Sequence, residues 1–145
     1  MRPILNDDAD LVMGSRLAEP GAAIAGGMPR WKWVANRMLT GIENAVLGTH
    51  LSEMHTGYRA YSRKLLIDVP FLRNALDFSF DSEMLFQSVH FGFRIKEVPA
   101  HSRYFEDASS VDLRQGIVYG LKTLWACARL QLHRGGLVRS RKYVR

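Results

Sequence analysis

Cysteine is nearly absent from this chain: Cys127 is the one cysteine among 145 residues. A single cysteine excludes an internal disulfide framework and a cysteine-rich zinc site. Long apolar runs are also missing, because no stretch reaches the roughly 18 residues that a membrane-spanning helix needs. The first ten residues carry three aspartates and no apolar centre, unlike a secretory signal. We therefore expect a cytoplasmic protein with one hydrophobic core.

Acidic residues are absent from the C-terminal end. Residues 1–112 hold 12 Lys and Arg against all 14 Asp and Glu, whereas residues 113–145 hold eight bases and no acid. A basic end of this kind binds anionic surfaces, and the attraction falls with salt. No nucleic-acid reader motif with interleaved aromatics is present, so we expect an anionic membrane surface and no nucleic acid as partner. A basic nucleic-acid-binding module stays the alternative, which stronger binding to duplex DNA than to anionic vesicles would favour.

Hydrophobic periodicity predicts strands alternating with helices. Such alternation indicates an α/β fold with a small, mostly parallel sheet of about three strands. Gly48 is placed to end one of the helices. The predicted elements are a strand at 10–16, a loop at 19–27, a helix at 31–47, an extended segment at 54–62 leading into a short helix from 63, a helix at 78–91, a strand at 93–99 and a helix at 111–133.

The last predicted helix carries an apolar stripe and a basic side. We expect the stripe to pack on the sheet, and we also expect the helix and tail to suit the surface of an anionic membrane. The stripe consists of Leu113, Ile117, Leu121, Leu124 and Ala128, and the bases opposite are Arg114, Lys122 and Arg129.

Six motifs in series resemble the C-terminal half of a family 2 glycosyltransferase of the GT-A fold, the group that includes dolichyl-phosphate mannose synthase-like enzymes. Each motif alone is a weak signal, but their order along the chain is that of the family. The resemblance covers about residues 9 to 120. The motifs are ADLVMGSR (9–16), GMP with WK and ANR (27–37), HTGYRAY (55–61), DFSFDSE (77–83), RIKEVP (94–99), and RYF with ASS (103–110).

The resemblance implies the acceptor-side half of a GT-A, Rossmann-like fold with a C-terminal amphipathic helix. We expect residues 1–133 to form a partial glycosyltransferase domain that lacks the N-terminal nucleotide-binding half, and residues 134–145 to form a basic flexible tail. The implied reaction moves a sugar from a nucleotide-sugar donor to a lipid-phosphate or hydroxyl acceptor at the inner face of the membrane. We expect the chain to be inactive alone.

The resemblance also implies Mg²⁺ or Mn²⁺, with ligands mostly outside this chain. Asp8 and Asp10 spell the family's Asp-x-Asp metal motif, but here the triplet leads directly into a strand instead of following one. We therefore expect a solvated turn at this point and no metal ligand. The five histidines show no HExxH or paired spacing, which argues against a zinc site.

Basic residues are the candidates for binding an acceptor phosphate. Arg16 ends a strand at the carboxyl edge of the sheet, where open α/β sheets bind ligands. A guanidinium there can bind phosphate oxygens in bidentate fashion, and a surface salt bridge is the equal alternative. Lys32 is placed to reach the same phosphate. By resemblance, Arg103 belongs to a loop that closes over the diphosphate.

A second group surrounds Gly57, which we expect to supply a tight turn. His55 is expected to face the cleft, although an isolated histidine more often has a structural role. Arg59 is expected to hold the acidic residues in place. Among those, Asp81 and Glu83 are the catalytic candidates, because a partly desolvated carboxylate can take a proton from an acceptor hydroxyl.

Two alternatives stay open at this point. Asp81 and Glu83 would be structural if the acceptor is already a phosphate, with Asp81 capping a helix and Glu83 favoured by the helix dipole. The chain would be an inactive remnant if it acts by pairing with another chain, since a cut sheet edge is a template for association. A homodimer would support that reading.

Overall fold

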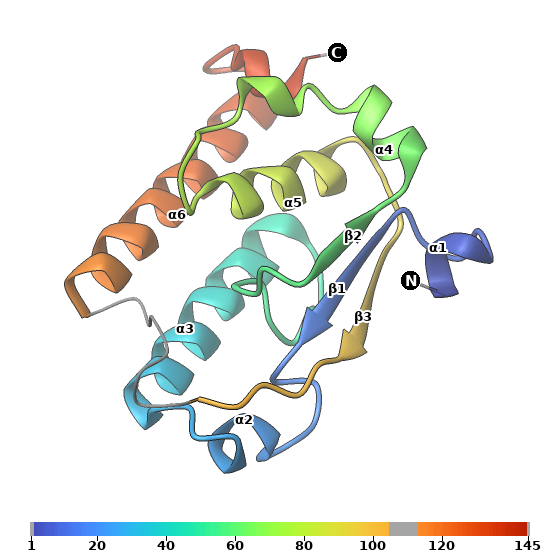
Figure 1. The fold of residues 1–145 in the computed structure, drawn as a ribbon. Coiled ribbons are helices and arrows are strands. Elements are labelled where there is room, and N and C mark those ends of the chain that lie inside the picture. Colours follow the sequence, from blue (N-terminus) through green and yellow to red (C-terminus); the bar gives the residue numbers. More distant parts are fainter. Residues whose placement is uncertain (1, 105–112, 145) are drawn as a thin grey trace.

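The computed structural model describes residues 2–104 and 113–144, and the serine pair at 109–110 lies outside them. Helices and strands alternate along the chain, in agreement with the predicted α/β class (Figure 1). The elements in order are α1 (Arg2–Leu5), β1 (Leu11–Ser15), α2 (Ala22–Ala25), α3 (Arg30–Leu47), β2 (Arg59–Tyr61), α4 (Arg63–Asp68), η1 (Phe71–Arg73), α5 (Phe80–His90), β3 (Ile95–Pro99), α6 (Leu113–Arg134) and η2 (Arg141–Tyr143). The segment predicted as a loop before α3 therefore contains a one-turn helix.

The described sheet has three strands in the order β2-β1-β3. β1 pairs with β3 in parallel, with Leu11 opposite Ile95, and with β2 in antiparallel orientation, with Leu11 opposite Tyr61. The prediction of a mostly parallel sheet was therefore wrong, because one of the two pairings is antiparallel. After β1 the chain passes through α3 and then returns along residues 48–58, so β2 enters the sheet in the direction opposite to β1. β1 is central and every one of its residues is buried.

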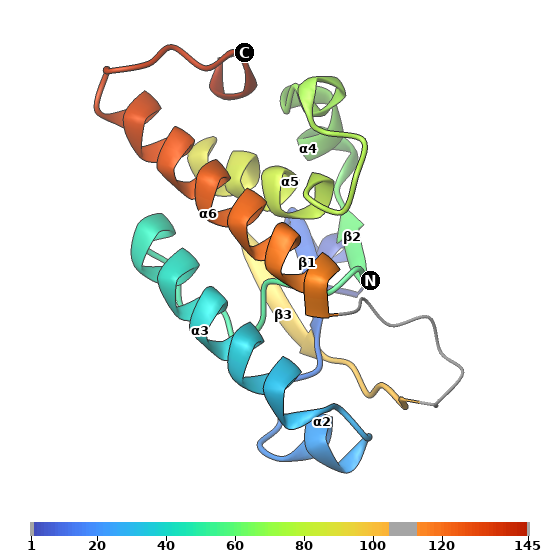
Figure 2. The same ribbon diagram turned by 90° about the vertical axis from the view of Figure 1, so that its left-hand side faces the viewer.

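Three helices, α3, α5 and α6, cover one side of the sheet (Figure 2). α5 lies between the sheet and α6, so its residues 82–88 are all buried. The core forms where these layers meet, around Leu11, Met13, Leu85, Phe86 and Leu130. Burial of these apolar side chains is the main term that stabilises the fold.

α3 ends where the sequence predicted. Gly48 adopts the left-handed conformation with φ 69°, and its N–H donates to the carbonyl of Asn44 at 2.8 Å. Residues with a Cβ avoid this conformation, so the glycine allows the chain to turn back toward the core. Asn44 then uses its side chain to accept from the backbone N–H of Leu51 at 2.9 Å, which fixes the start of the following loop.

The apolar stripe of α6 points away from the core, contrary to prediction, and large apolar residues of α3 also point outward. On α6 the buried residues are the small or polar Thr123, Ala126 and Cys127, followed by Leu130, and on α3 they are Thr40, Glu43 and Leu47. Small side chains let α6 approach its neighbours closely, and periodicity alone does not tell which side of a helix meets the core. The outward residues, here named the α3–α6 apolar face, are Trp31, Val34, Met38, Ile42, Ile117, Leu121, Leu124 and Trp125.

The C-terminal segment, predicted as a flexible tail, lies against α5 and η1. Tyr143 is 4% exposed. Lys142 forms an ion pair with Glu83, and Gln87 donates to the carbonyl of Lys142 at 2.8 Å. Arg73 donates to the carbonyl of Arg141 at 2.6 Å. These bonds give residues 141–143 a defined place in the structure.

The turn that leads into α5 generates a pH prediction. The Asp77 carboxylate forms an ion pair with Lys122. It also accepts hydrogen bonds from the backbone N–H and the hydroxyl of Ser79. Lys122 and then Ser79 lower the pKa of Asp77 from 3.8 to about 2. A lowered pKa stabilises the folded state above pH 4, and this stabilisation is lost as the pH falls from about 4 to about 2.

The variant Asp77→Asn lacks the titrating carboxyl. We expect its free energy of unfolding to depend less steeply on pH between 4 and 2 than that of the parent protein. Urea titrations at several pH values, followed by circular dichroism, measure this difference. Equal pH dependence in the two proteins would contradict the assignment.

Candidate functional site

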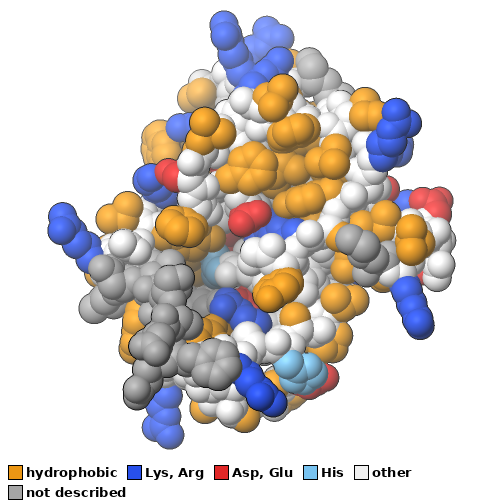
Figure 3. All heavy atoms as spheres, viewed as in Figure 1, with side chains coloured by type: hydrophobic (Ala, Val, Ile, Leu, Met, Phe, Trp, Pro, Cys, Tyr) orange, Lys and Arg blue, Asp and Glu red, His pale blue; other side chains and the backbone are white. Residues whose placement is uncertain are grey.

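A cavity of about 670 Å³ opens at the carboxyl end of β1, between α3, the 54–59 loop, the start of α5, residues 102–104 and the start of α6. Acidic, basic and histidine side chains meet at a hollow on this face of the molecule (Figure 3). Six of the seven predicted site residues line the cavity, and Glu83 is the exception. The six are Arg16, Lys32, His55, Arg59, Asp81 and Arg103.

Arg16 is held by a buried carboxylate, Glu53, which is fully inaccessible to solvent. The backbone N–H of Arg16 donates to Glu53 Oε2 at 2.7 Å, and its side-chain Nε donates to Oε1 at 2.9 Å. Burial acts against the charged guanidinium, but the hydrogen bonds and charge of Glu53 outweigh it, so the pKa of Arg16 is raised. Arg16 therefore forms a salt bridge, the alternative considered for it, but its partner is the buried Glu53 instead of a surface carboxylate.

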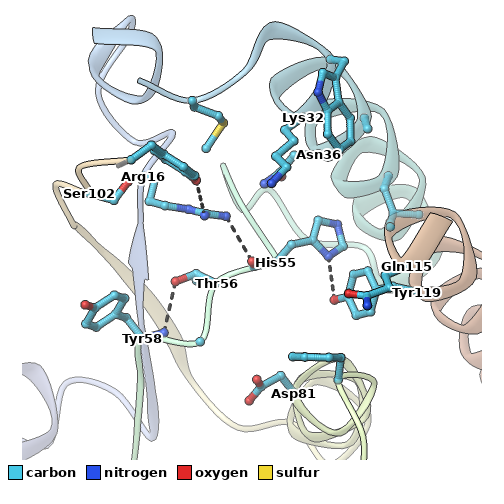
Figure 4. Close-up of a pocket in the computed structure, with 18 of the residues that line it drawn as sticks. Arg16, Lys32, Asn36, His55, Thr56, Tyr58, Asp81, Ser102, Gln115 and Tyr119 are labelled. Carbon is cyan, nitrogen blue, oxygen red and sulfur yellow. Dashed lines mark hydrogen bonds between the residues drawn. The ribbon is translucent and has the colours of Figure 1, made fainter. Parts of the chain in front are cut away.

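The same guanidinium also reaches across the cavity. Its Nη1 donates to the hydroxyl of Tyr104 at 2.6 Å, and its Nη2 donates to the carbonyl of His55 at 3.1 Å (Figure 4). Arg16 thus joins the end of β1 to the loop that carries His55 and to residues 102–104. Its position at the edge of the sheet agrees with the rule for ligand sites in open α/β sheets.

Glu53 is itself fixed by its neighbours. Asn36 of α3 donates to Glu53 Oε1 at 2.8 Å. Glu97 of β3 accepts from the backbone N–H groups of Ser52 at 2.8 Å and Glu53 at 3.1 Å. The carboxylate that holds Arg16 is therefore tied to both α3 and β3, which makes the cavity floor rigid.

His55 is the centre of a second buried network. Its Nε2 lies 3.0 Å from Oε2 of Glu43, a residue of α3 with no exposed surface, in a geometry that makes no hydrogen bond. Its Nδ1 lies 2.9 Å from the hydroxyl of Tyr119 of α6, and that hydroxyl lies 2.9 Å from Ser82 Oγ of α5. Burial raises the pKa of Tyr119, so its hydroxyl stays protonated. Both ring nitrogens of His55 thus face protein groups.

Arg59 connects the same loop to α5. Its side chain is 2% exposed and donates to the carbonyls of Thr56 at 2.9 Å, Met54 at 2.7 Å and Asp81. Its Nε lies 3.9 Å from the Asp81 carboxylate, which is 43% exposed toward the cavity. Arg59 therefore lies against Asp81 but not against Glu83, and three of its five N–H donors bond to backbone carbonyls of the protein.

Glu83 lies away from the cavity. Its carboxylate forms an ion pair with Lys142 and accepts from the backbone N–H of Ala75 at 2.8 Å. One helical turn is 3.6 residues, so Asp81 and Glu83 point in different directions on α5. Of the two catalytic candidates, the structure thus brings Asp81 alone to the cavity. Asp81 does not cap the helix by its side chain, since Ser79 occupies the N-cap.

Lys32 and Arg103 complete the basic lining. Within the described residues Lys32 has no carboxylate partner, and its ammonium lies 5.3 Å from the ring centre of Trp31. Arg103 follows Ser102 in a segment that rests on α2, where Tyr104 N–H donates to the carbonyl of Gly26 at 2.8 Å. A Cβ at Gly26 would lie 2.2 Å from the Ser102 carbonyl, so glycine is required for this close approach.

Gly57 does not have the role predicted for it. Its φ is not positive, and a Cβ built on it meets nothing within 4 Å. The turn at this point is held instead by hydrogen bonds, since Tyr58 N–H donates to Thr56 Oγ1 at 3.2 Å. A small side chain at position 57 would therefore fit without straining the backbone.

Residues that the sequence interpretation missed are the two buried glutamates, Glu43 and Glu53, and Tyr119. Glu43 offered no signal, because the large apolar residues of α3 lie on its other side and the burial of Thr40, Glu43 and Leu47 is evident from the fold alone. Glu53 offered none, since it pairs with a residue 37 positions earlier. Arg16 and Glu53 therefore meet only in the folded chain.

The described residues do not fit a divalent metal. They contain no cluster of three or more His, Cys, Asp or Glu side chains. Asp10 pairs with Arg94 at 3.0 Å, and Arg94 lowers the pKa of this carboxyl. Both aspartates were expected in a solvated turn. Asp8 is exposed, whereas Asp10 is buried, with 8% of its surface exposed. At the cavity itself, Asp81 is the single carboxylate among the described lining residues.

The pairing of Arg16 with Glu53 generates a stability prediction. In Glu53→Gln the guanidinium loses its counter-charge in a mostly buried position, which typically costs about 3 kcal/mol of unfolding free energy. Glu19→Gln is the matched control, since Glu19 pairs with His101 on the surface and its side chain is 51% exposed. We expect the control to change stability by less than about 0.5 kcal/mol in urea titrations. Equal effects of the two substitutions would contradict the role given to Glu53.

Comparison with known proteins links the chain to sugar transfer. It is 31% identical over 96 residues to the dolichyl-phosphate hexose transferase of Haloferax volcanii, a match that spans 66% of this chain and 39% of that protein. It is 33% identical over 97 residues to the low-salt glycan biosynthesis hexosyltransferase Agl6 of the same organism, spanning 66% of this chain and 22% of that protein. No family model and no solved structure matches the chain.

The chain thus corresponds to well under half the length of either relative. No helix in the described ranges has the length and hydropathy to span a bilayer. Over about two thirds of its length, this chain is related to glycosyltransferases.

Proposed function

We propose that this chain is the acceptor-side part of a family 2 glycosyltransferase of the GT-A fold. In this proposal it binds a lipid phosphate or another membrane-associated acceptor, which receives a sugar from a nucleotide-sugar donor. The observation that carries the proposal is the charge of the cavity, which four Lys and Arg side chains and one carboxylate line. Such an excess of fixed positive charge favours an anionic ligand.

The bases contribute to acceptor binding in different ways. Lys32 lacks a carboxylate partner in the described part of the chain, so its ammonium is available to a phosphate. Arg16 and Arg59 are committed to Glu53 and to backbone carbonyls, so they supply fixed positive potential more than new hydrogen bonds. Arg103 also lines the cavity and would add a further base to the phosphate. One available ammonium group among guanidinium groups that are already fixed is the arrangement expected of a pre-organised anion site.

In the proposed reaction an acceptor oxygen attacks the anomeric carbon of the sugar, and the bond from that carbon to the donor diphosphate breaks. A phosphate acceptor is already ionised near neutral pH and needs no base. A hydroxyl acceptor must lose a proton, and Asp81 is the cavity carboxylate placed to take it. The fixed position of Asp81 beside Arg59 supports this assignment.

The donor and its metal are placed outside this chain in the proposal. The described residues do not form a divalent-metal centre, and we route no step through one. The relation of this chain to only part of two longer transferases agrees with a divided site. An inactive remnant that acts by pairing with a partner chain is the second candidate, because the free edge of β2 ends the described sheet.

Acceptor binding can be measured with farnesyl phosphate, a short polyprenyl phosphate. We expect Lys32→Ala to weaken its binding about tenfold, because a charge-assisted hydrogen bond is lost. Lys64→Ala is the control, since Lys64 is an exposed lysine that pairs with Asp68 on α4. Isothermal titration calorimetry gives both dissociation constants.

Asp81→Asn should change this affinity in the opposite direction. Removing the negative charge from the cavity lowers its repulsion of phosphate, so we expect binding a few-fold tighter. Farnesol, which has no phosphate, should not bind measurably. A loss with Lys64→Ala equal to that with Lys32→Ala, or equal binding of farnesol, would contradict the acceptor site.

Donor binding tests the divided site separately. We expect no measurable heat when the chain is titrated with sugar nucleotides in the presence of Mg²⁺ or Mn²⁺, since the residues described here offer no metal-diphosphate site. A titration with farnesyl phosphate serves as the positive control. Tight binding of any sugar nucleotide would show that the donor site lies within this chain.

A further inference from the structure

One side of α5 binds the C-terminal segment of the chain. Glu83, Gln87 and His90 lie on this side at helical spacing. The carboxylate of Glu83 forms an ion pair with Lys142, and Nε2 of Gln87 donates to the Lys142 carbonyl at 2.8 Å. Nε2 of His90 faces the carbonyl oxygen of Tyr143 at 3.2 Å, which makes this nitrogen the donor. Successive turns of α5 therefore bind two consecutive residues, Lys142 and Tyr143.

η1 binds the same segment. Nη1 of Arg73 donates to the carbonyls of Arg141 at 2.6 Å and Val144 at 2.9 Å. Each carbonyl from Arg141 to Val144 therefore has a side chain of α5 or η1 as its partner. In Figures 1 and 2 the segment lies at the end of the molecule opposite to α2, beside η1 and outside the sheet. Its release would break neither the sheet nor a long helix, so it can open as a local unit.

Tyr143 is the buried anchor of the segment. It is 4% exposed, and its ring stacks on that of His133 of α6 with the ring centres 5.5 Å apart. The ring centre of His90 lies 5.2 Å from that of Tyr143 and 5.3 Å from that of His133. Three rings from α5, α6 and η2 therefore meet at one point. Two of them are imidazoles, the side chain whose charge ordinarily changes between pH 5 and 8.

The groups around these rings disfavour added positive charge. His90 faces His133 and Arg134, and the carboxylate nearest to the rings, Glu83, is already paired with Lys142. Two protonated rings would therefore repel each other and Arg134 in a partly buried position. The titratable and charged groups that face the three rings are Arg129, Arg134 and the Cys127 thiol of α6, Glu83 of α5, and Lys142 and the Tyr143 phenol of η2.

Protonation of His133 also removes a hydrogen bond. The backbone N–H of Ser140, the N-cap of η2, donates to Nδ1 of His133 at 3.4 Å. The same nitrogen lies 3.3 Å from the carbonyl oxygen of Val138. A protonated Nδ1 has no lone pair and cannot accept from Ser140, so it is left with Val138 as its partner. The first residue of η2 then loses its bond to α6.

The burial of His90 sets the direction of the pH dependence. Burial lowers the pKa of His90 from its ordinary value of 6.5; the bond to the Tyr143 carbonyl opposes this shift, and the charges of His133 and Arg134 add to it. The docked state therefore binds a proton less readily than the released state. Docking is stable above about pH 6.5 and weakens as the pH falls below this value.

We propose that residues 140–144 form a pH-sensitive latch, which is docked on α5 at neutral pH and released in mildly acidic solution by protonation of His90 and His133. Release uncovers the polar side of α5 and frees the basic residues Arg141 and Lys142. The described residues that line the cavity include none of those that hold the latch. The latch therefore goes beyond the proposed function and does not depend on it.

Nuclear magnetic resonance of the ¹⁵N-labelled full chain measures release of the latch. We expect backbone order parameters of about 0.85 for Lys142 and Tyr143 at pH 7.5 and below about 0.6 at pH 5, while the residues of β1 stay rigid at both pH values. The midpoint of this change should coincide with the titration of the His90 ring in the same protein. An ordered segment at pH 5, or a midpoint displaced from the titration of His90, would overturn the proposal.

A double variant, His90→Gln with His133→Asn, removes the two titrating rings. It keeps a donor for the Tyr143 carbonyl and an acceptor for the N–H of Ser140. We expect its segment to stay ordered at pH 5. Release at pH 5 in this variant would assign the change to Glu83 or another group and would contradict the latch. If the variant is already mobile at pH 7.5, the midpoint measured in the parent protein decides.

His101→Gln is the matched control. His101 pairs with Glu19 on the surface and its side chain is 74% exposed, so this variant should release the segment at the same pH as the parent protein. Tyr143→Ala lacks the buried anchor, and its segment should be mobile at both pH values. Unchanged chemical shifts in β1 and β3 verify that each variant folds. An effect of His101→Gln equal to that of the double variant would also overturn the proposal.

Discussion

The cavity depends on one buried ion pair, Arg16 with Glu53. Glu53 has no exposed surface, and it joins the end of β1 to Asn36 of α3, while its own backbone is held by Glu97 of β3. Removing a charge from water is costly unless its partners satisfy it. Every polar contact of Glu53 is therefore also a constraint on where α3, β1 and β3 meet. The guanidinium that Glu53 holds extends this constraint to His55 and Tyr104, which both line the cavity.

In two helices, polar side chains face the interior and large apolar side chains face outward, which is the second feature that organises the structure. α3 and α6 present Thr40, Glu43 and Thr123 to the interior, while Met38, Leu121 and other large apolar side chains face outward. Among the polar groups inside, Glu43 lies 3.0 Å from Nε2 of His55, whereas the apolar groups outside are exposed. One pair of helices therefore supplies both a wall of the cavity and the surface beside its opening.

Much of the fold could be predicted, because strands 11–15 and 95–99 and the four longer helices follow local periodicity. Gly48 as a helix end also follows from local chemistry. The direction of β2, the outward stripes and the separation of Asp81 from Glu83 could not, since each depends on how elements dock. Six of seven candidate residues line one cavity because the resemblance supplied their order along the chain. The glutamates that fix them were missed, since buried partners distant in sequence carry no local pattern.

The central claim is that this cavity receives the phosphate of a lipid acceptor. Nuclear magnetic resonance of the ¹⁵N-labelled chain tests it most directly, because 145 residues are within its ordinary reach. On addition of farnesyl phosphate, the account predicts chemical-shift changes concentrated at Arg16, Lys32 and His55, with His90 and His133 unchanged at the far end of α5 and α6. Changes confined to the basic C-terminal residues, with none at the cavity, would contradict it.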